Sequence, residues 1–395
     1  MNNGGILLRE KFRRLLEEAE RLNHIFKDRI EESRRRLESA INFEEADRVP
    51  IQVWVEGMSG WYLRGKYGLN MAEYFRSPEL QAIYQLKERI DAFKELSDDR
   101  LEISTKVGVE GGVVAHPSVI GCRIVFPEDD WPWIDLRYHP LDTPEKIDDF
   151  QVPEIAEAGI MPQIIERYER MVKMVGDLVE VTIYPGDGVP ECPLQMAVYA
   201  RGYSNLVKDM YTNPDLAHKL IRKMCEVGEA IHSFYRDFLG SELLQVEAVD
   251  LYDNFLGHFS PKLIRKFILP YYREWAEKYG WKYWTISSQC VLDPYIEIMS
   301  ELPTKCISYL TSFSNLKLFK ETFTPRKAWI KVAYEASLML TQTPEEVEKE
   351  CRRIMEIMAP GGGFIMGTAC LDWKTPEENI RTFIDASKKY GKYGV

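Results

Sequence analysis

Two cysteines stand where short apolar runs of the chain end. Cys290 follows the run KYWTIS by three positions, and Cys370 directly follows GFIMGTA, 80 positions further on. Both runs are predicted to be strands, and the carboxyl ends of parallel strands meet at one edge of a sheet. A cysteine in such a place is either a small buried apolar group or a ligand. The placement predicts one shared site for both thiols, whereas the other five cysteines are interpreted as buried apolar side chains.

Eight apolar runs alternate with helical patterns from Arg48 onward, and their composition predicts strands. Residues 260–280 are expected to form one helix, with Ser260 as its cap and Pro261 in its first turn. Residues 111–160, rich in Pro and aromatic residues, predict an inserted hairpin and loop. This order predicts an α/β fold, a closed (β/α)8 TIM barrel. The predicted strands lie within residues 48–57, 101–112, 178–188, 242–253, 282–290, 305–312, 327–336 and 363–373.

Polar and aromatic side chains gather at the predicted carboxyl ends of these strands, where barrels of this kind carry out their chemistry. Asp250 and Asp253 are candidates for this reason, although they could instead cap the following helix. His258 is a candidate substrate contact or a loop-packing residue. The strand ends select Trp54, Glu56, Glu110, Tyr184, Asp187, Glu247, Asp250, Tyr252, Asp253, Ser287, Ser288, Cys290, Tyr334, Glu335, Cys370 and Asp372.

Composition excludes several classes of partner. The net charge of −11 argues against nucleic acid, because binding phosphates requires a concentrated field of Lys and Arg. Seven cysteines without a CxxC pair indicate a reduced compartment, and the cytoplasm is expected. No apolar run has the length of a signal peptide core or of a membrane span, so a membrane partner is not expected.

Residues 8–41 are dense in charge and repeat apolar side chains at helical spacing, which predicts one long amphipathic helix. Its apolar stripe could mediate a homodimer or clasp the barrel, or the helix could lie solvated on its own domain. The expected organisation is an N-terminal helical extension over residues 1–43 and a barrel over residues 44–395.

Several separated blocks of the sequence resemble the uroporphyrinogen decarboxylase superfamily. They include RVPI near the start, YPGDGVPECPLQMAVYARGYSNLVKDMYTNPDLAHKLI in the middle, SPKLIRKFILPYYREW, and the closing GGGFIMGTACLDWKTPEENIRTFIDASKKYGKY. The resemblance spans about residues 44–393 and implies a (β/α)8 barrel. The superfamily contains porphyrinogen decarboxylases and zinc-dependent corrinoid methyltransferases.

The resemblance is closest to the methyltransferase branch. The decarboxylases bind the carboxylates of their substrate with an N-terminal arginine pair, and that pair is missing from VPIQVWVEGMSGWYLRGKYG. Carboxylates at the expected mouth, such as Glu56 and Glu110, would repel a polyanionic porphyrinogen. In the methyltransferases a His-x-Cys after strand five and a Cys after strand eight hold zinc. The matching positions here are Ser288, Cys290 and Cys370, so the thiols are kept and the histidine is a serine.

The resemblance then implies a zinc ion held by Cys290, Cys370 and a carboxylate, with Glu247 or Asp250 as the replacement ligand. Glu247, Asp250 and Glu110 are expected to be catalytic, since a buried carboxyl group with a raised pKa can protonate a leaving oxygen. The substrate contacts are expected to be Trp54, Tyr184, Asp187, Tyr252, Asp253, His258 and Tyr334.

The expected activity is transfer of a methyl group from a small methylated donor, favoured to be an aryl methyl ether, to cob(I)alamin. A separate corrinoid protein is the expected partner and carrier of the cobalamin, because the chain lacks a corrinoid-binding DxHxxG motif. Three alternatives stay open. They are methyl transfer from methylcobalamin to a thiol, a metal-free decarboxylase or lyase of the same superfamily, and a barrel that serves only as a binding subunit.

Overall fold

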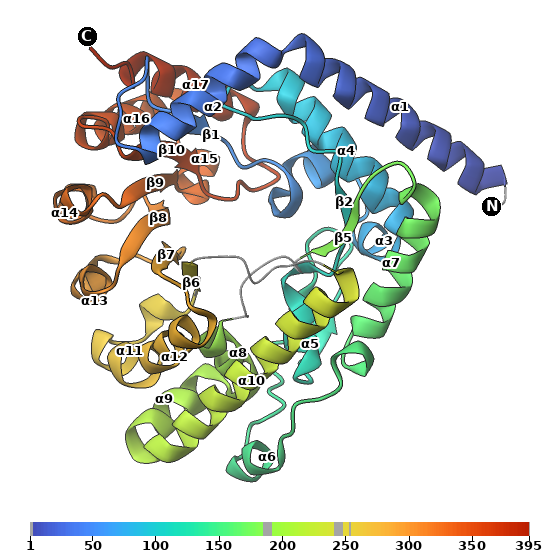
Figure 1. Cartoon of the computed structure of the whole chain (residues 1–395), viewed down its shortest axis with the longest axis vertical. Helices are drawn as coiled ribbons and strands as arrows, with labels where there is room; N and C mark the ends of the chain where they lie inside the picture. The colour runs from blue at the N-terminus through green and yellow to red at the C-terminus, as the bar shows by residue number, and fades with distance from the viewer. Residues whose placement is uncertain (1–2, 185–191, 241–247, 253, 395) are drawn as a thin grey trace. The chain divides into compact units, whose positions relative to one another are not determined.

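A computed structural model describes residues 3–184, 192–240, 248–252 and 254–394, with the backbone alone at residues 3–5, 248–250 and 252. The chain is an α/β protein whose main strands are joined in parallel (Figure 1). Its contacts divide it into two compact units. Unit 1 comprises residues 1–69, 83–105 and 285–395, and unit 2 comprises residues 70–82 and 106–284. None of the described helices combines the length and the apolar character that crossing a bilayer requires.

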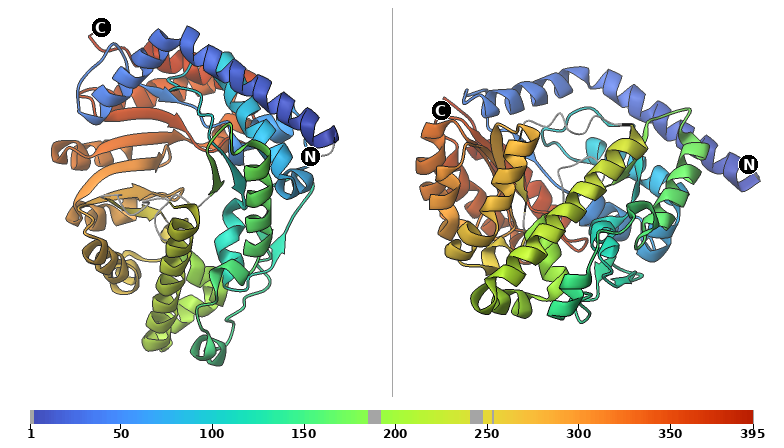
Figure 2. Two further views of the ribbon diagram at one scale, coloured as in Figure 1. Left: turned by 45° about the vertical axis from the view of Figure 1, so that its right-hand side comes forward. Right: turned by 60° about the horizontal axis from the view of Figure 1, so that its bottom comes forward.

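Unit 1 is built on parallel strands that neighbour one another in the order β1, β10, β9, β8 (Figure 2). The register pairs Gln52 of β1 with Gly367 of β10, and Gly367 with Ala333 of β9. Their apolar side chains are almost entirely buried, which explains why these strands are continuous apolar runs rather than alternating ones. The bounds are β1 Ile51–Gln52, β8 Thr304–Thr311, β9 Trp329–Tyr334 and β10 Phe364–Thr368, with β7 Tyr283–Ser287 beside β8.

Helices of unit 1 cover one face of this sheet. The ring of Tyr334 on β9 meets Phe383 of α17 edge to face, with the ring centroids 5.6 Å apart. α16 begins with a capping box in which Thr343 and Glu346 satisfy each other's backbone N–H groups. The helices are α1 Asn3–Ile25, α2 Lys27–Ile41, α4 Pro78–Glu95 from residue 83 onward, α13 Ile296–Glu301, α14 Leu316–Phe323, α15 Ala336–Thr341, α16 Pro344–Met358 and α17 Glu377–Tyr390.

The N-terminal helix bends at Phe26, so the prediction of one continuous helix over residues 8–41 is wrong in that detail. The bend lets the Phe26 ring meet Phe93 edge to face, with centroids 5.8 Å apart. Asn23 exchanges two hydrogen bonds with the backbone of Ile103, and Arg29 donates to the carbonyl oxygens of Phe93 and Leu96. The extension therefore clasps the segment that follows α4 within unit 1.

Unit 2 contains a parallel pair, β2 Val107–Glu110 with β5 Val181–Tyr184, and the strand β6 Ala248–Tyr252. The antiparallel pair β3 Ile124–Val125 and β4 Trp133–Ile134 confirms the predicted inserted hairpin. The helices are α3 Met71–Arg76, α5 Ala115–Val119, α6 Pro144–Asp149, α7 Met161–Val175, α8 Pro193–Arg201, α9 Tyr203–Thr212, α10 Pro214–Leu239, α11 Pro261–Phe267 and α12 Leu269–Tyr279.

The single helix predicted over residues 260–280 is two helices, α11 and α12, separated at Ile268. Pro270 explains the break, because proline has no N–H to donate and its ring collides with the carbonyl group four residues earlier. Ser260 caps α11 as expected, accepting a hydrogen bond from the backbone N–H of Leu263. Each of the eight runs predicted as strands contains a strand, at β1, β2 and β5 to β10.

Candidate functional site

Two aspartates fix the strand that leads to Trp54. Asp99 accepts hydrogen bonds from the backbone N–H of Ile51 and from the guanidinium groups of Arg36 and Arg48, at 2.6 to 3.1 Å. The Asp99 side chain is only 1% exposed, so these are charge pairs in a poorly solvated place. Asp98 accepts a hydrogen bond from the backbone N–H of Val53, the residue before Trp54. The buried ion pairs and hydrogen bonds of Asp98 and Asp99 therefore fix the position of the strand end, in addition to the backbone hydrogen bonds of the parallel sheet.

Arg100 ties the same strand end to Glu56. Its guanidinium donates to the Val53 carbonyl oxygen at 2.9 Å and forms ion pairs with Glu56 and Asp98. Burial raises the pKa of Glu56, and the charge of Arg100 opposes that rise. Glu56 is therefore held by a structural ion pair, and Arg100 is already engaged by two carboxylates.

The ends of β1 and β10 bring Trp54 and Cys370 into one neighbourhood. The Trp54 N–H donates to the Thr368 hydroxyl at 2.9 Å, and the Leu371 N–H donates to the Trp54 carbonyl oxygen at 3.2 Å. Burial raises the pKa of the Cys370 thiol to about 12. Burial thus disfavours the thiolate form of Cys370.

Cys290 follows β7 within unit 1, as Cys370 follows β10. Its backbone N–H donates to the hydroxyl of Ser288, the residue at the position of the expected histidine, which is 1% exposed. Among the described side chains no three His, Cys, Asp or Glu residues come together in a way that could hold a metal ion. The predicted third ligand, Glu247, lies outside the described residues. Thiols are suitable ligands for zinc, which takes about three protein donors at a catalytic site, and the assignment of Cys290 and Cys370 as ligands stays a prediction.

Tyr334 and Glu335 point to different surroundings although they are adjacent at the end of β9. Tyr334 is fully buried, its ring packs on Phe383, and its hydroxyl group bonds to Gln342. The Glu335 carboxylate accepts a hydrogen bond from the hydroxyl of Thr311, the last residue of β8. Burial raises the pKa of Glu335, and the Thr311 hydrogen bond opposes that rise. The structure thus gives Tyr334 a packing role and leaves Glu335 as the more accessible polar group.

In unit 2, Glu110 and Tyr184 stand side by side at the carboxyl ends of β2 and β5. They are partners in the parallel register, and the N–H of Gly111 donates to the Tyr184 carbonyl oxygen at 3.0 Å. The Glu110 backbone exchanges two hydrogen bonds with the side-chain amide of Gln81. This arrangement joins two of the predicted site residues.

His258 lies exposed in a short helical turn, where Tyr203 donates its hydroxyl hydrogen to the His258 carbonyl oxygen at 2.8 Å. Its ring faces Tyr203 and Phe255, with centroids about 6 Å away. These contacts are those of a loop-packing residue. Of the remaining predicted residues, Asp187, Glu247 and Asp253 lie outside the described residues, as do the side chains of Asp250 and Tyr252.

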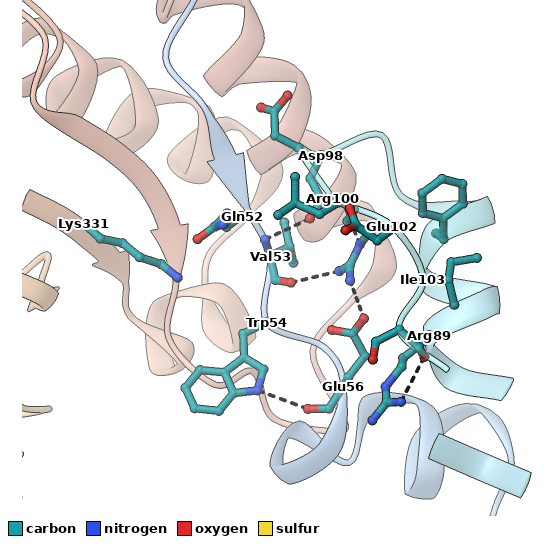
Figure 3. A pocket seen from close by; sticks show the side chains of 14 residues that line it. Gln52, Val53, Trp54, Glu56, Arg89, Asp98, Arg100, Glu102, Ile103 and Lys331 are labelled. Carbon is teal, nitrogen blue, oxygen red and sulfur yellow. Dashed lines mark hydrogen bonds and ion pairs between the residues drawn. The ribbon is translucent and has the colours of Figure 1, made fainter. Parts of the chain in front are cut away.

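A pocket of about 360 Å³ opens beside the end of β1, entirely within unit 1 (Figure 3). The 38% exposed indole of Trp54 forms part of its wall, and the indole N–H donates to the Glu56 carbonyl oxygen at 3.1 Å. Of the residues in this wall only Trp54 and Glu56 were predicted from the sequence, and the charged residues missed include Lys331, in the middle of β9. A cation inside the apolar run AWIKVAY was the available signal. The wall is formed by Gln52, Val53, Trp54, Glu56, Arg89, Phe93, residues 98–104 and Lys331.

The chain resembles known proteins both in sequence and in fold. The family model described as uroporphyrinogen decarboxylase (URO-D) matches residues 32–390. A solved structure of a methyltransferase from Methanosarcina mazei is similar in fold, with a TM-score of 0.62 and 18% identity over 90% of this chain and 98% of that one. No protein with a curated description matches the sequence.

Proposed function

Because the chain belongs to the uroporphyrinogen decarboxylase family, we propose that it is a corrinoid-dependent methyltransferase of that family. The observation that carries this proposal is the placement of Cys290 and Cys370 after β7 and β10, in the same unit of the structure. These are the positions at which the methyltransferase branch keeps its zinc-binding cysteines. The fold shared with the Methanosarcina mazei methyltransferase is consistent with it. We also propose that the eight strands close into the (β/α)8 barrel typical of the family.

The surroundings of β1 argue against a porphyrinogen as the substrate. A substrate with many carboxylates needs several unengaged arginines for charge-assisted hydrogen bonds. In the described pocket wall, Arg100 is paired with Glu56 and Asp98, and Arg89 donates to the Ser104 carbonyl oxygen. The pocket therefore suits a small molecule better than a polyanionic macrocycle.

The proposed reaction moves a methyl group from the oxygen of an aryl methyl ether to the cobalt(I) of a corrinoid carried by a partner protein. The carbon–oxygen bond breaks, the carbon–cobalt bond forms from the cobalt electron pair, and the departing phenolate oxygen takes up a proton. Asp250 and Glu110 are the proposed proton donors, and Glu247 would take that role only where Asp250 binds zinc in its place, because a carboxylate bound to zinc carries no proton. Zinc held by Cys290, Cys370 and Glu247 would supply Lewis acidity at the donor oxygen. Trp54 offers a flat apolar surface for the aromatic ring.

An assay of cob(I)alamin methylation tests the proposal. The full-length protein is incubated with cob(I)alamin and, in turn, methoxyarenes, methanol, methylamines and methyl thiols, and the absorbance of cob(I)alamin is followed. We expect methoxyarenes to consume cob(I)alamin, and we expect a chelator to abolish the reaction and added zinc to restore it. No consumption with any donor would contradict the proposal.

The same assay separates the alternatives. A methyltransferase acting on thiols would demethylate methylcobalamin when a thiol is supplied and would leave methoxyarenes untouched. A metal-free decarboxylase or lyase would release its product equally well after chelation. A barrel without catalysis would bind no zinc.

A further inference from the structure

Lys331 occupies an unusual place for a lysine. It is the third residue of β9, which pairs with β8 on one side and β10 on the other, and it is only partly exposed. Side chains two positions apart share a face of a sheet, so Lys331 and Tyr334, three positions apart, lie on opposite faces. Tyr334 faces α17. Lys331 therefore points away from the covering helices and into the pocket beside β1 (Figure 3).

The neighbouring strand makes room for this lysine. A Cβ atom at Gly367 of β10 would lie 2.6 Å from the Cε atom of Lys331 and 3.4 Å from its Cγ atom. The first of these distances is shorter than real contacts allow, so any side chain at position 367 would displace the lysine. The absence of a side chain at Gly367 thus lets the aliphatic part of Lys331 lie across the sheet.

The other charged side chains of the pocket wall are already engaged. Arg100 is paired with Glu56 and Asp98, and Arg89 donates to a backbone carbonyl oxygen. Asp99 binds Arg36 and Arg48, and Glu102 binds Arg34. Within the part of the chain that the structure describes, no hydrogen bond or ion pair is formed by the Lys331 ammonium group. Burial lowers the pKa of Lys331, which is the expected effect of removing a cation from water without supplying a counter-charge.

We propose that Lys331 binds a carboxylate group of the substrate, which makes the methyl donor a methoxylated aromatic acid rather than a neutral ether. This inference rests on the proposed function for the identity of the ring and of the methyl group. A cation that is partly removed from water gains from a counter-charge, and the pocket gives a small anion access to it. One carboxylate balances one ammonium charge, whereas a doubly charged phosphate would keep one negative charge without a partner, since Arg100 on the same wall is already paired with Glu56 and Asp98. Trp54 on the same wall supplies the apolar contact for the ring.

Binding of benzoate tests this inference without methyl transfer. Calorimetric titration of the full-length protein compares benzoate with benzyl alcohol, a neutral molecule of similar size. We expect benzoate to bind at least about tenfold more tightly, and the Lys331→Met variant to lose that preference. The matched control is Lys317→Met on α14, where the lysine side chain is 76% exposed, and it should bind benzoate as the unaltered protein does.

Equal binding of the two probes, no binding of benzoate, or full benzoate binding by Lys331→Met would each overturn the inference. The comparison of the two probes needs only the unaltered protein, so it decides the matter even if Lys331→Met fails to fold. The outcome is also separable from the proposed function. A protein that prefers benzoate through Lys331 but never methylates cob(I)alamin would retain the inference and lose the function. A protein that demethylates neutral and acidic methoxyarenes equally well, with or without Lys331, would retain the function and lose the inference.

Discussion

Replacement of Asp99 by asparagine is expected to lower the free energy of unfolding by about 3–5 kcal/mol, the usual result of removing one partner from a buried charge pair. The substitution keeps the size of the side chain and removes its charge. Arg48, only 11% exposed at the side chain, would then lose its carboxylate partner, whereas Arg36 would lose one of its partners and keep Asp47 and Glu32. Urea denaturation of the full-length protein, followed by circular dichroism, measures the change.

Glu102→Gln is the matched control for this prediction. Glu102 pairs with Arg34 at 2.8 Å, but its side chain is 56% exposed, and exposed pairs contribute about 0–1 kcal/mol. A loss of stability in Asp99→Asn no larger than in Glu102→Gln would show that solvent reaches Arg36 and Arg48 and that the pair is not a buried one.

Replacement of Cys290 or Cys370 by serine is expected to remove bound zinc and to lower the rate of methyl transfer at least about 100-fold. Loss of groups that merely support a metal ligand already costs 10- to 100-fold in metal affinity or activity, and loss of a ligand should cost more. A serine hydroxyl is a poor substitute for a thiolate. Metal content measured by mass spectrometry on protein purified without chelators, together with the cob(I)alamin assay, tests both parts.

Cys306→Ser provides the control for the cysteine variants. Cys306 is a buried residue near the start of β8, away from the carboxyl ends of the strands, and it is not a predicted ligand. It should keep its zinc. If the unaltered protein contains no zinc, or if the Cys290 and Cys370 variants keep it, the proposed role of zinc in the reaction is contradicted.

The order of strands was predictable because each is a short apolar run between stronger helical patterns. Two interruptions of helices were not predicted, one of which has a signal in the sequence and one of which has none. Pro270 separates α11 from α12 although the apolar spacing continues across it. The bend at Phe26 has no local breaker, and it becomes understandable only through the contact with Phe93, which lies 67 positions further along the chain.

The sequence predicted which strand ends carry candidate site residues, but it did not predict the face of the sheet on which each side chain lies. Trp54 and Cys370 were selected by that rule, and hydrogen bonds of the Trp54 backbone with the Thr368 hydroxyl and with the Leu371 N–H bring them together. Tyr334 was selected by the same rule, yet it packs against α17, because the face on which a side chain lies depends on the register of the strand. Lys331 was missed because the rule considers ends of strands and ignores their middles.

The clasp formed by α1 and α2 bears on how this protein can be shortened. The region matched by the family model begins at residue 32, after both Asn23 and Arg29. A polypeptide started at that boundary would keep every residue of the pocket wall and yet lose the side chains that hold the backbone of Phe93, Leu96 and Ile103. The limits of family similarity are therefore not the limits of the folding unit, and expression of residues 32–390 alone would leave one wall of the pocket unsupported.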